Sequence, residues 1–171
     1  EDAGAVYNEG DNSVVGNSTF VNNTAKYGGA IMNDAYGLVL DDSTFTNNTA
    51  KIGGAIYNSA DCFVVGNSTF ANNTATSNGG VIFNYGIGFV VGNSTFVNNG
   101  AADGAGAILN GGRGFVVGNS TFANNTATSK GGAIINNGKL VVDNSVFEDN
   151  AANYYGGAIF NWDDLQVTNS A

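Results

Sequence analysis

The feature of this sequence that most constrains its fold is a short apolar motif that recurs every 25 or 26 residues. The motif reads Gly-Gly-Ala-Ile in its best copies, and a second motif, Phe-x-x-Asn, lies between successive copies with the same spacing. Two motifs that stay in phase along the whole chain indicate an array of one structural unit, without a central core. The first motif occupies residues 3–6, 28–31, 53–56, 79–82, 105–108, 131–134 and 156–159, and the second begins at Phe20, Phe45, Phe70, Phe96, Phe122 and Phe147.

Each unit is built from apolar segments that are too short for helices. Within residues 55–80, three such segments at 55–58, 63–65 and 68–72 are separated by loops, and the longest loop is 73–80. Short apolar segments bounded by Gly and Asn predict strands. Three strands per unit predict a parallel β-helix, in which each strand pairs with its copy one coil later. We expect an all-β solenoid of about seven coils forming a single array over residues 1–171, either an excerpt of a longer protein or an uncapped subunit.

The facing of side chains follows from a comparison of the copies. In the second strand the middle position is Val in most copies but Gln166 in the last, so it is predicted to face solvent while its neighbours face inward. The Phe residues are expected to stack inside the coils. The same alternation places the Asn two residues after each Phe inward, in a ladder of hydrogen-bonded amides. This row is Asn22, Asn47, Asn72, Asn98 and Asn124, with Asp149 in the last copy; a second ladder is expected at Asn8, Asn33, Asn58, Asn84, Asn110, Asn136 and Asn161.

A column of large apolar residues directly follows the nearly invariant Ile of the first motif. If the Ile side chains face inward, the two-residue period of a strand places this column outside, where a continuous apolar stripe is unusual for a monomer. The sequence leaves open whether the column is covered by the chain's own loops, docks another chain, or exchanges places with the Ile column. The candidate docking residues are Tyr7, Met32, Tyr57, Phe83, Leu109, Ile135 and Phe160.

Glycan attachment is a further candidate, because Asn-x-Ser/Thr sequons recur at two positions of the repeat. The sequons that start two residues after a Phe are expected to be inaccessible, since that Asn is predicted to face inward. The Gly-Asn-Ser-Thr corner is expected to be exposed. The candidate glycosylation sites are therefore Asn17, Asn67, Asn93 and Asn119.

The charged residues suggest no catalytic or metal site. The chain has no His and a single Cys, which excludes an internal disulfide and the usual nucleophile–base pairs. We interpret Arg113 as a solvated loop cation, and the pairs Asp41-Asp42 and Asp163-Asp164 as turn or edge residues. We therefore expect no catalysis, cofactor or metal. A net charge of −9 disfavours nucleic acid as a partner, and no apolar run approaches the length of a membrane span.

The phased alternation of Gly-Gly-Ala-Ile with Phe-x-x-Asn resembles the repeat of chlamydial polymorphic outer-membrane proteins, and similar repeats occur in adhesin-like proteins of methanogenic archaea. This resemblance covers the whole chain and implies a right-handed β-helix displayed at the cell surface, outside the cell, and used in adhesion. The resemblance does not name a host or receptor; the partners that we expect are a host or cell-surface glycan or protein, or other copies of the chain. The alternatives are a structural filament subunit that self-associates end to end or laterally through the apolar column and, more weakly, a carbohydrate-active β-helix enzyme.

Overall fold

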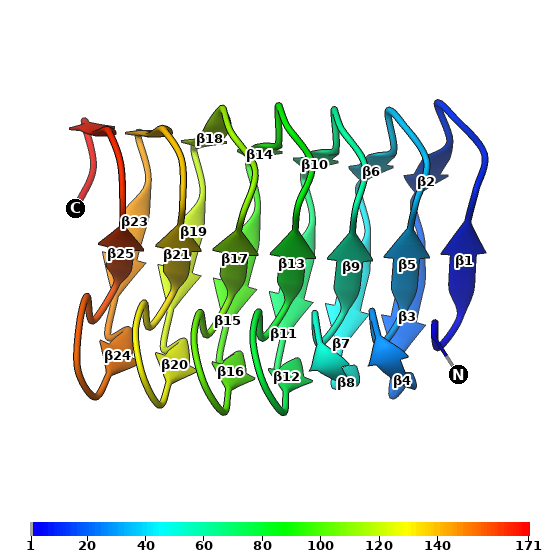
Figure 1. Ribbon diagram of the computed structural model, residues 1–171, viewed down its shortest axis with the longest axis horizontal. Coiled ribbons are helices and arrows are strands. Elements are labelled where there is room, and N and C mark those ends of the chain that lie inside the picture. Colours follow the sequence, from blue (N-terminus) through cyan, green and yellow to red (C-terminus); the bar gives the residue numbers. More distant parts are fainter. Residues whose placement is uncertain (1) are drawn as a thin grey trace.

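The computed structural model describes residues 2–171, and all regular secondary structure in this part of the chain is β-strand. The chain winds through coils that stack along one axis, from the N-terminal coil in blue to the C-terminal coil in red (Figure 1). Equivalent strands of successive coils pair in parallel and in register, as Phe70 does with Phe45 and Phe96. The predicted parallel β-helix of about seven coils is therefore confirmed.

Four sheets run along the stack, and we number them in the order in which the chain visits them. The first sheet consists of β1 (Val6–Asn8), β5 (Ile31–Asn33), β9 (Ile56–Asn58), β13 (Ile82–Asn84), β17 (Ile108–Asn110), β21 (Ile134–Asn136) and β25 (Ile159–Asn161). The second consists of β2 (Val14–Gly16), β6 (Val39–Asp41), β10 (Val64–Gly66), β14 (Val90–Gly92), β18 (Phe115–Gly118), β22 (Leu140–Asp143) and β26 (Leu165–Thr168). The third consists of β3 (Thr19–Val21), β7 (Thr44–Thr46), β11 (Thr69–Ala71), β15 (Thr95–Val97), β19 (Thr121–Ala123) and β23 (Val146–Glu148).

The fourth sheet was not predicted. It consists of β4 (Thr24–Tyr27), β8 (Thr49–Ile52), β12 (Thr74–Ala75), β16 (Gly100–Ala101), β20 (Thr126–Ala127) and β24 (Ala151–Ala152). Its strands are as short as two residues and lie at the start of the segment that we expected to be one long loop. A coil therefore contains four strands where three were expected, and the true loop before the paired glycines is correspondingly shorter.

The interior is filled by columns of identical or similar side chains. Leu38, Leu40, Phe63 and Val65 are buried, whereas the middle residues Val90 and Val116 are exposed, which confirms the predicted facing of the second strand. The Phe residues of the second motif stack with ring centroids 4.7–5.0 Å apart from Phe20 to Phe147, close to the ~4.8 Å spacing of paired strands. The apolar residues of each coil therefore stack on their counterparts in the coils above and below and form one continuous core.

The prediction for the Asn two residues after each Phe is wrong. These residues are exposed, and their backbone is left-handed, with φ of 56° at Asn47 and at Asn72. A left-handed residue turns the corner between the third and fourth sheets and breaks the two-residue alternation. The following Asn therefore points inward, so the buried ladder is Asn23, Asn48, Asn73, Asn99, Asn125 and Asn150.

The second predicted ladder, at the end of the first-sheet strands, is confirmed. Asn33 donates to Asn58, and Asn58 donates to Asn84, each at 2.6 Å between Nδ2 and Oδ1. The second Nδ2 hydrogen bond of each of these amides goes to a backbone carbonyl two residues later, as from Asn33 to Ala35. Within residues 2–171, no buried side-chain nitrogen or oxygen lacks a hydrogen-bond partner, so the interior is polar in places but fully satisfied.

Candidate functional site

The apolar column that follows each Ile lies on the outer face of the first sheet. Its facing is settled by the Ile residues, since Ile31, Ile56, Ile82, Ile108 and Ile134 are fully buried. The outward column is not a continuous stripe, however. Its exposure is highest at the N-terminal coil, where Tyr7 is 52% exposed, and lowest in the middle of the rod, where Phe83 is 6% exposed.

The chain's own loops cover the middle of this column. The ring of Tyr85, in the loop after β13, meets Phe83 edge-on with centroids 4.8 Å apart. On the other side, the backbone of Gly104 approaches Ile135 so closely that a Cβ would lie 2.6 Å from its Cδ1. Of the alternatives that the sequence left open, cover by loops therefore holds for Phe83 and Ile135, while both ends of the column retain accessible side chains.

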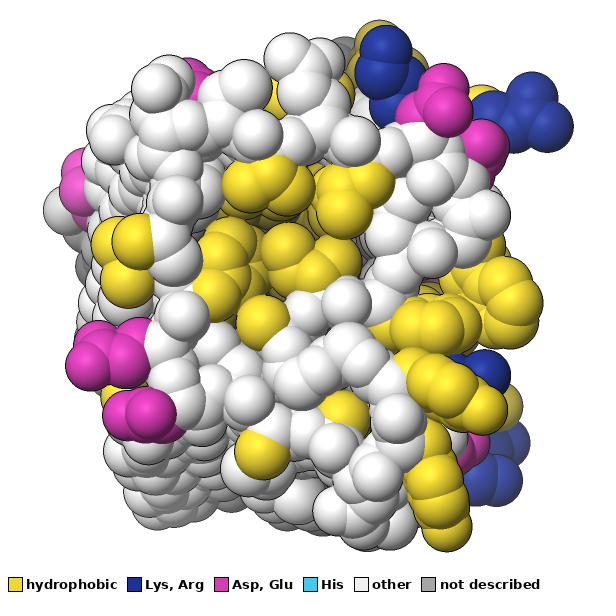
Figure 2. Space-filling model, turned by 90° about the vertical axis from the view of Figure 1, so that its left-hand side faces the viewer, with side chains coloured by type: hydrophobic (Ala, Val, Ile, Leu, Met, Phe, Trp, Pro, Cys, Tyr) yellow, Lys and Arg dark blue, Asp and Glu magenta, His cyan; other side chains and the backbone are white. Residues whose placement is uncertain are grey.

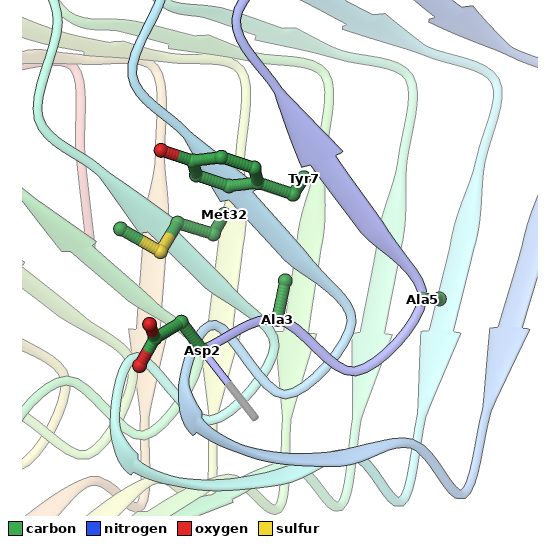
Figure 3. A pocket seen from close by; sticks show the side chains of 5 residues that line it. All are labelled: Asp2, Ala3, Ala5, Tyr7 and Met32. Atoms are coloured by element: carbon green, nitrogen blue, oxygen red, sulfur yellow. The ribbon is translucent and has the colours of Figure 1, made fainter.

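At the N-terminal end, Tyr7 and Met32 line a pocket of about 370 Å³ together with Asp2, Ala3 and Ala5 (Figure 3). The Tyr7 hydroxyl donates a hydrogen bond of 2.8 Å to Asp34 Oδ2. This hydrogen bond and the nearby carboxylates raise the pKa of Tyr7 to about 12, so its phenol stays protonated at any physiological pH. Among its described lining residues, the pocket offers an aromatic wall and a carboxylate, but no basic side chain.

At the C-terminal end, the outward column terminates in a cluster of aromatic residues around one lysine. Phe160 contacts Trp162 edge-on, with centroids 4.9 Å apart, and Tyr155 lies 6.1 Å from Phe160. The Lys130 ammonium lies over all three rings. In the end-on view of this part of the molecule, apolar side chains gather both along one side and in the hollow at the centre of the last coil (Figure 2). The sequence analysis named only Phe160 in this cluster. Tyr155 and Trp162 could have been found from the sequence, because both are aromatic residues in the loops that directly flank β25.

A family model for the Chlamydia polymorphic membrane protein repeat matches the chain five times, at residues 17–34, 42–59, 67–85, 119–137 and 144–161, which together exceed half of its length. The chain belongs to this repeat family. No curated protein and no solved structure gives a significant match.

The matched polymorphic membrane protein repeats share one structural frame. Each match begins at the left-handed corner residue before the third sheet, such as Asn67 with φ of 45°, and ends at or just after an Asn of the first-sheet ladder. Residues 93–111 fold in the same way but lie outside the five matches. This coil has Gly100 at a position where the matched repeats have Thr or Ala, and Ala105 where the matched repeats have the first Gly of the Gly-Gly pair.

The repeat frame also accounts for most of the polar residues that we singled out. Asp41 and Asp42 replace the Gly-Asn corner, and Asp42 has the left-handed φ of 47° that Asn adopts elsewhere. Arg113 is exposed in the loop before β18. Among residues 2–171, no group of three or more His, Cys, Asp or Glu residues is arranged to hold a metal ion.

The sequon positions of the polymorphic membrane protein repeats are all accessible. The four candidate glycosylation sites Asn17, Asn67, Asn93 and Asn119 are exposed at the corner between the second and third sheets. The sequons at Asn22, Asn47, Asn72 and Asn124, which we expected to be inaccessible, are exposed as well. Both rows flank the third sheet, and glycan attachment there stays a prediction.

Membership of the polymorphic membrane protein repeat family implies a surface or outer-membrane protein with a β-helical fold. No helix of the length and hydropathy required to cross a membrane is found among residues 2–171.

Proposed function

We propose that this chain is a noncatalytic segment of an extracellular adhesin or stalk, which spaces and presents binding residues at the cell surface. The observation that supports this proposal is the placement of the exposed aromatic residues. All exposed Tyr and Trp side chains among residues 2–171 lie on the first sheet or in the loops that flank it: Tyr7, Tyr36, Tyr85, Tyr154, Tyr155 and Trp162.

The opposite side of the rod has a different chemistry. The outer face of the third sheet carries Thr in most coils, as at Thr69 and Thr95, together with small apolar residues and the corner Asn rows. Aromatic side chains supply large contact areas with little conformational entropy and are enriched at recognition surfaces. We therefore propose that attachment to a cell-surface glycan or protein uses the side of the first sheet, which we call the aromatic side.

Purified protein bound to fluorescent beads tests this function on cultured animal cells and on immobilised glycans. Replacement of Tyr36, Tyr154 and Trp162 by Ser removes exposed aromatic surface and is expected to reduce bead binding at least ~10-fold. A matched variant, Val21→Ser with Val146→Ser, removes exposed apolar surface from the third sheet and is expected to bind normally. Equal binding by both variants, or no binding of the unaltered protein to any surface, contradicts the proposal.

A structural filament subunit that self-associates end to end or laterally is the second candidate function. In the residues that the structure describes, the outer strands of the four sheets lie at the two ends of the stack, and unpaired strand edges favour addition of further strands. Electron micrographs of the purified chain distinguish the two functions, since long fibres would favour the filament over the adhesin.

A further inference from the structure

Three aromatic rings enclose the ammonium group of Lys130, and we call this cluster the aromatic cage. The Nζ atom lies 4.8 Å from the ring centroid of Phe160, 5.0 Å from that of Trp162 and 5.4 Å from that of Tyr155. The strand ladder holds the parts together, because Lys130 and Tyr155 are paired in a parallel bridge and Phe160 belongs to β25. Phe160 and Trp162 stand nearly at right angles, at 86°, so the cage has walls in different planes.

A cage of this kind attracts cations because the faces of aromatic rings are electronegative. The lysine ammonium is a poorly matched occupant, since it carries three N–H donors and is strongly hydrated. Within residues 2–171, Lys130 Nζ makes contacts to rings and donates to no carboxylate or carbonyl oxygen. A cation without N–H donors would gain the same attraction without losing hydrogen bonds to water.

We propose that the aromatic cage is a binding site for the trimethylammonium group of choline, either free or as a lipid headgroup. Lys130 occupies the cage in the absence of ligand and moves into solvent when choline binds. Tyr155 and Trp162 are 60% and 63% exposed, so the cage is open to solvent. The net charge of −9 favours the approach of a cation.

Lys26 provides a comparison between the cage and an ordinary surface cation–π pair. Lys26 Nζ lies 4.9 Å from the ring of Tyr27, with no second ring around it. A single exposed contact of this kind contributes about 0.5–1 kcal/mol, which is too little to hold a small ligand. Lys26 and Tyr27 therefore provide a matched control for Lys130 and its three rings.

The only Trp of the chain is part of the cage, so intrinsic fluorescence reports binding directly. Choline is titrated into the unaltered protein, and Trp162 emission is expected to change saturably. In Lys130→Ala the competing cation is absent, and choline should bind on the order of fivefold or more tightly. Tyr155→Ala and Phe160→Ala should weaken binding, Lys26→Ala should not alter it, and 3,3-dimethylbutanol, the neutral analogue of choline, should produce no saturable change.

A second measurement identifies the source of the choline group. Cosedimentation of the protein with phosphatidylcholine vesicles, abolished by Phe160→Ala, assigns the lipid headgroup, whereas saturation by choline without cosedimentation assigns the free compound. A linear response to choline in both the unaltered protein and Lys130→Ala, or an equal response to the neutral analogue, overturns the inference. This inference deepens the proposed function by naming a ligand on the aromatic side, but the two are tested separately: cell binding that persists in Phe160→Ala would leave adhesion standing without choline.

Discussion

At the scale of single residues, the left-handed corners determine which side chains reach the interior. Two corners of the typical coil contain an Asn with φ between 45° and 57°, as at Asn67 and Asn72. Asn tolerates this conformation better than other residues that carry a Cβ. After each corner the next residue, Ser68 or Asn73, is buried and hydrogen-bonds to its counterpart in the next coil. The recurrence of Asn is thus explained first by backbone geometry.

One interior coil has Ala where the matched repeats have Gly, and this position yields a prediction. Ala105 has φ of 61°, in the column where Gly79 and Gly131 have φ of 67° and 59°. A left-handed conformation costs a residue with a Cβ about 1–2 kcal/mol, part of which is offset by the greater chain entropy that Gly loses on folding. We expect Ala105→Gly to stabilise the protein by about 1 kcal/mol, measured as a higher urea midpoint.

The reverse change in the preceding coil is the control. In Gly79→Ala the new Cβ would lie 2.7 Å from the Ile82 carbonyl oxygen, so this variant should be destabilised by more than about 1 kcal/mol. An unchanged midpoint for Ala105→Gly would show that the coil relaxes around the Ala without strain.

At the scale of strands and ladders, the sequence was sufficient to predict the strand pairing and the facing of the second strand, but not the corners or the shortest strands. The repeat spacing predicted the parallel pairing, and Gln166 revealed the facing of the second strand because one polar substitution distinguishes the two sides. The strict alternation that we applied across Asn72 was wrong, because an Asn in a left-handed corner shifts the phase of the side chains and Asn also occurs in extended strands, as at Asn58. The strand Thr74–Ala75 was missed for another reason: a strand of two residues is too short to show any periodicity in the sequence. The aromatic cage depends on loop conformations, which the repeat does not determine.

The two adjacent Asn residues make the corrected facing testable. Asn73 Oδ1 accepts hydrogen bonds from the backbone and side-chain nitrogens of Asn48, and its Nδ2 donates to Phe45 O and Asn99 Oδ1. Asn73→Ala would leave these buried groups unpaired and should cost at least ~3 kcal/mol. Asn72→Ala removes only an exposed amide from a left-handed corner and should cost ~1 kcal/mol. Urea unfolding of both variants measures the difference, and a larger loss for Asn72→Ala would restore the original facing.

At the scale of the whole molecule, stability should vary along the rod because each coil is supported only by its neighbours. Val65 and Val91, in the middle coils, are fully buried, whereas Leu165 and Val167, at inward positions of the last coil, are 47% and 49% exposed. In the 171-residue chain, an interior coil buries its side chains on two sides and a terminal coil on one. Terminal coils should therefore open at a lower free energy than the rest.

Native-state hydrogen exchange resolves this gradient coil by coil. Amides of β10 and β14 are expected to exchange on the order of 100-fold more slowly than those of β26, with intermediate values in between. A proportional rise of the rates with hydroxide concentration would establish that they report opening equilibria. Uniform protection from β2 to β26 would instead show that the rod opens as one cooperative unit. In that case the free energy of coupling between adjacent coils would have to exceed the free-energy difference that arises from the poorer burial of the terminal coils.

Under the expected gradient, ligand binding at the aromatic cage, which joins Lys130 to the last coil, should slow exchange in β25 and leave β10 unchanged.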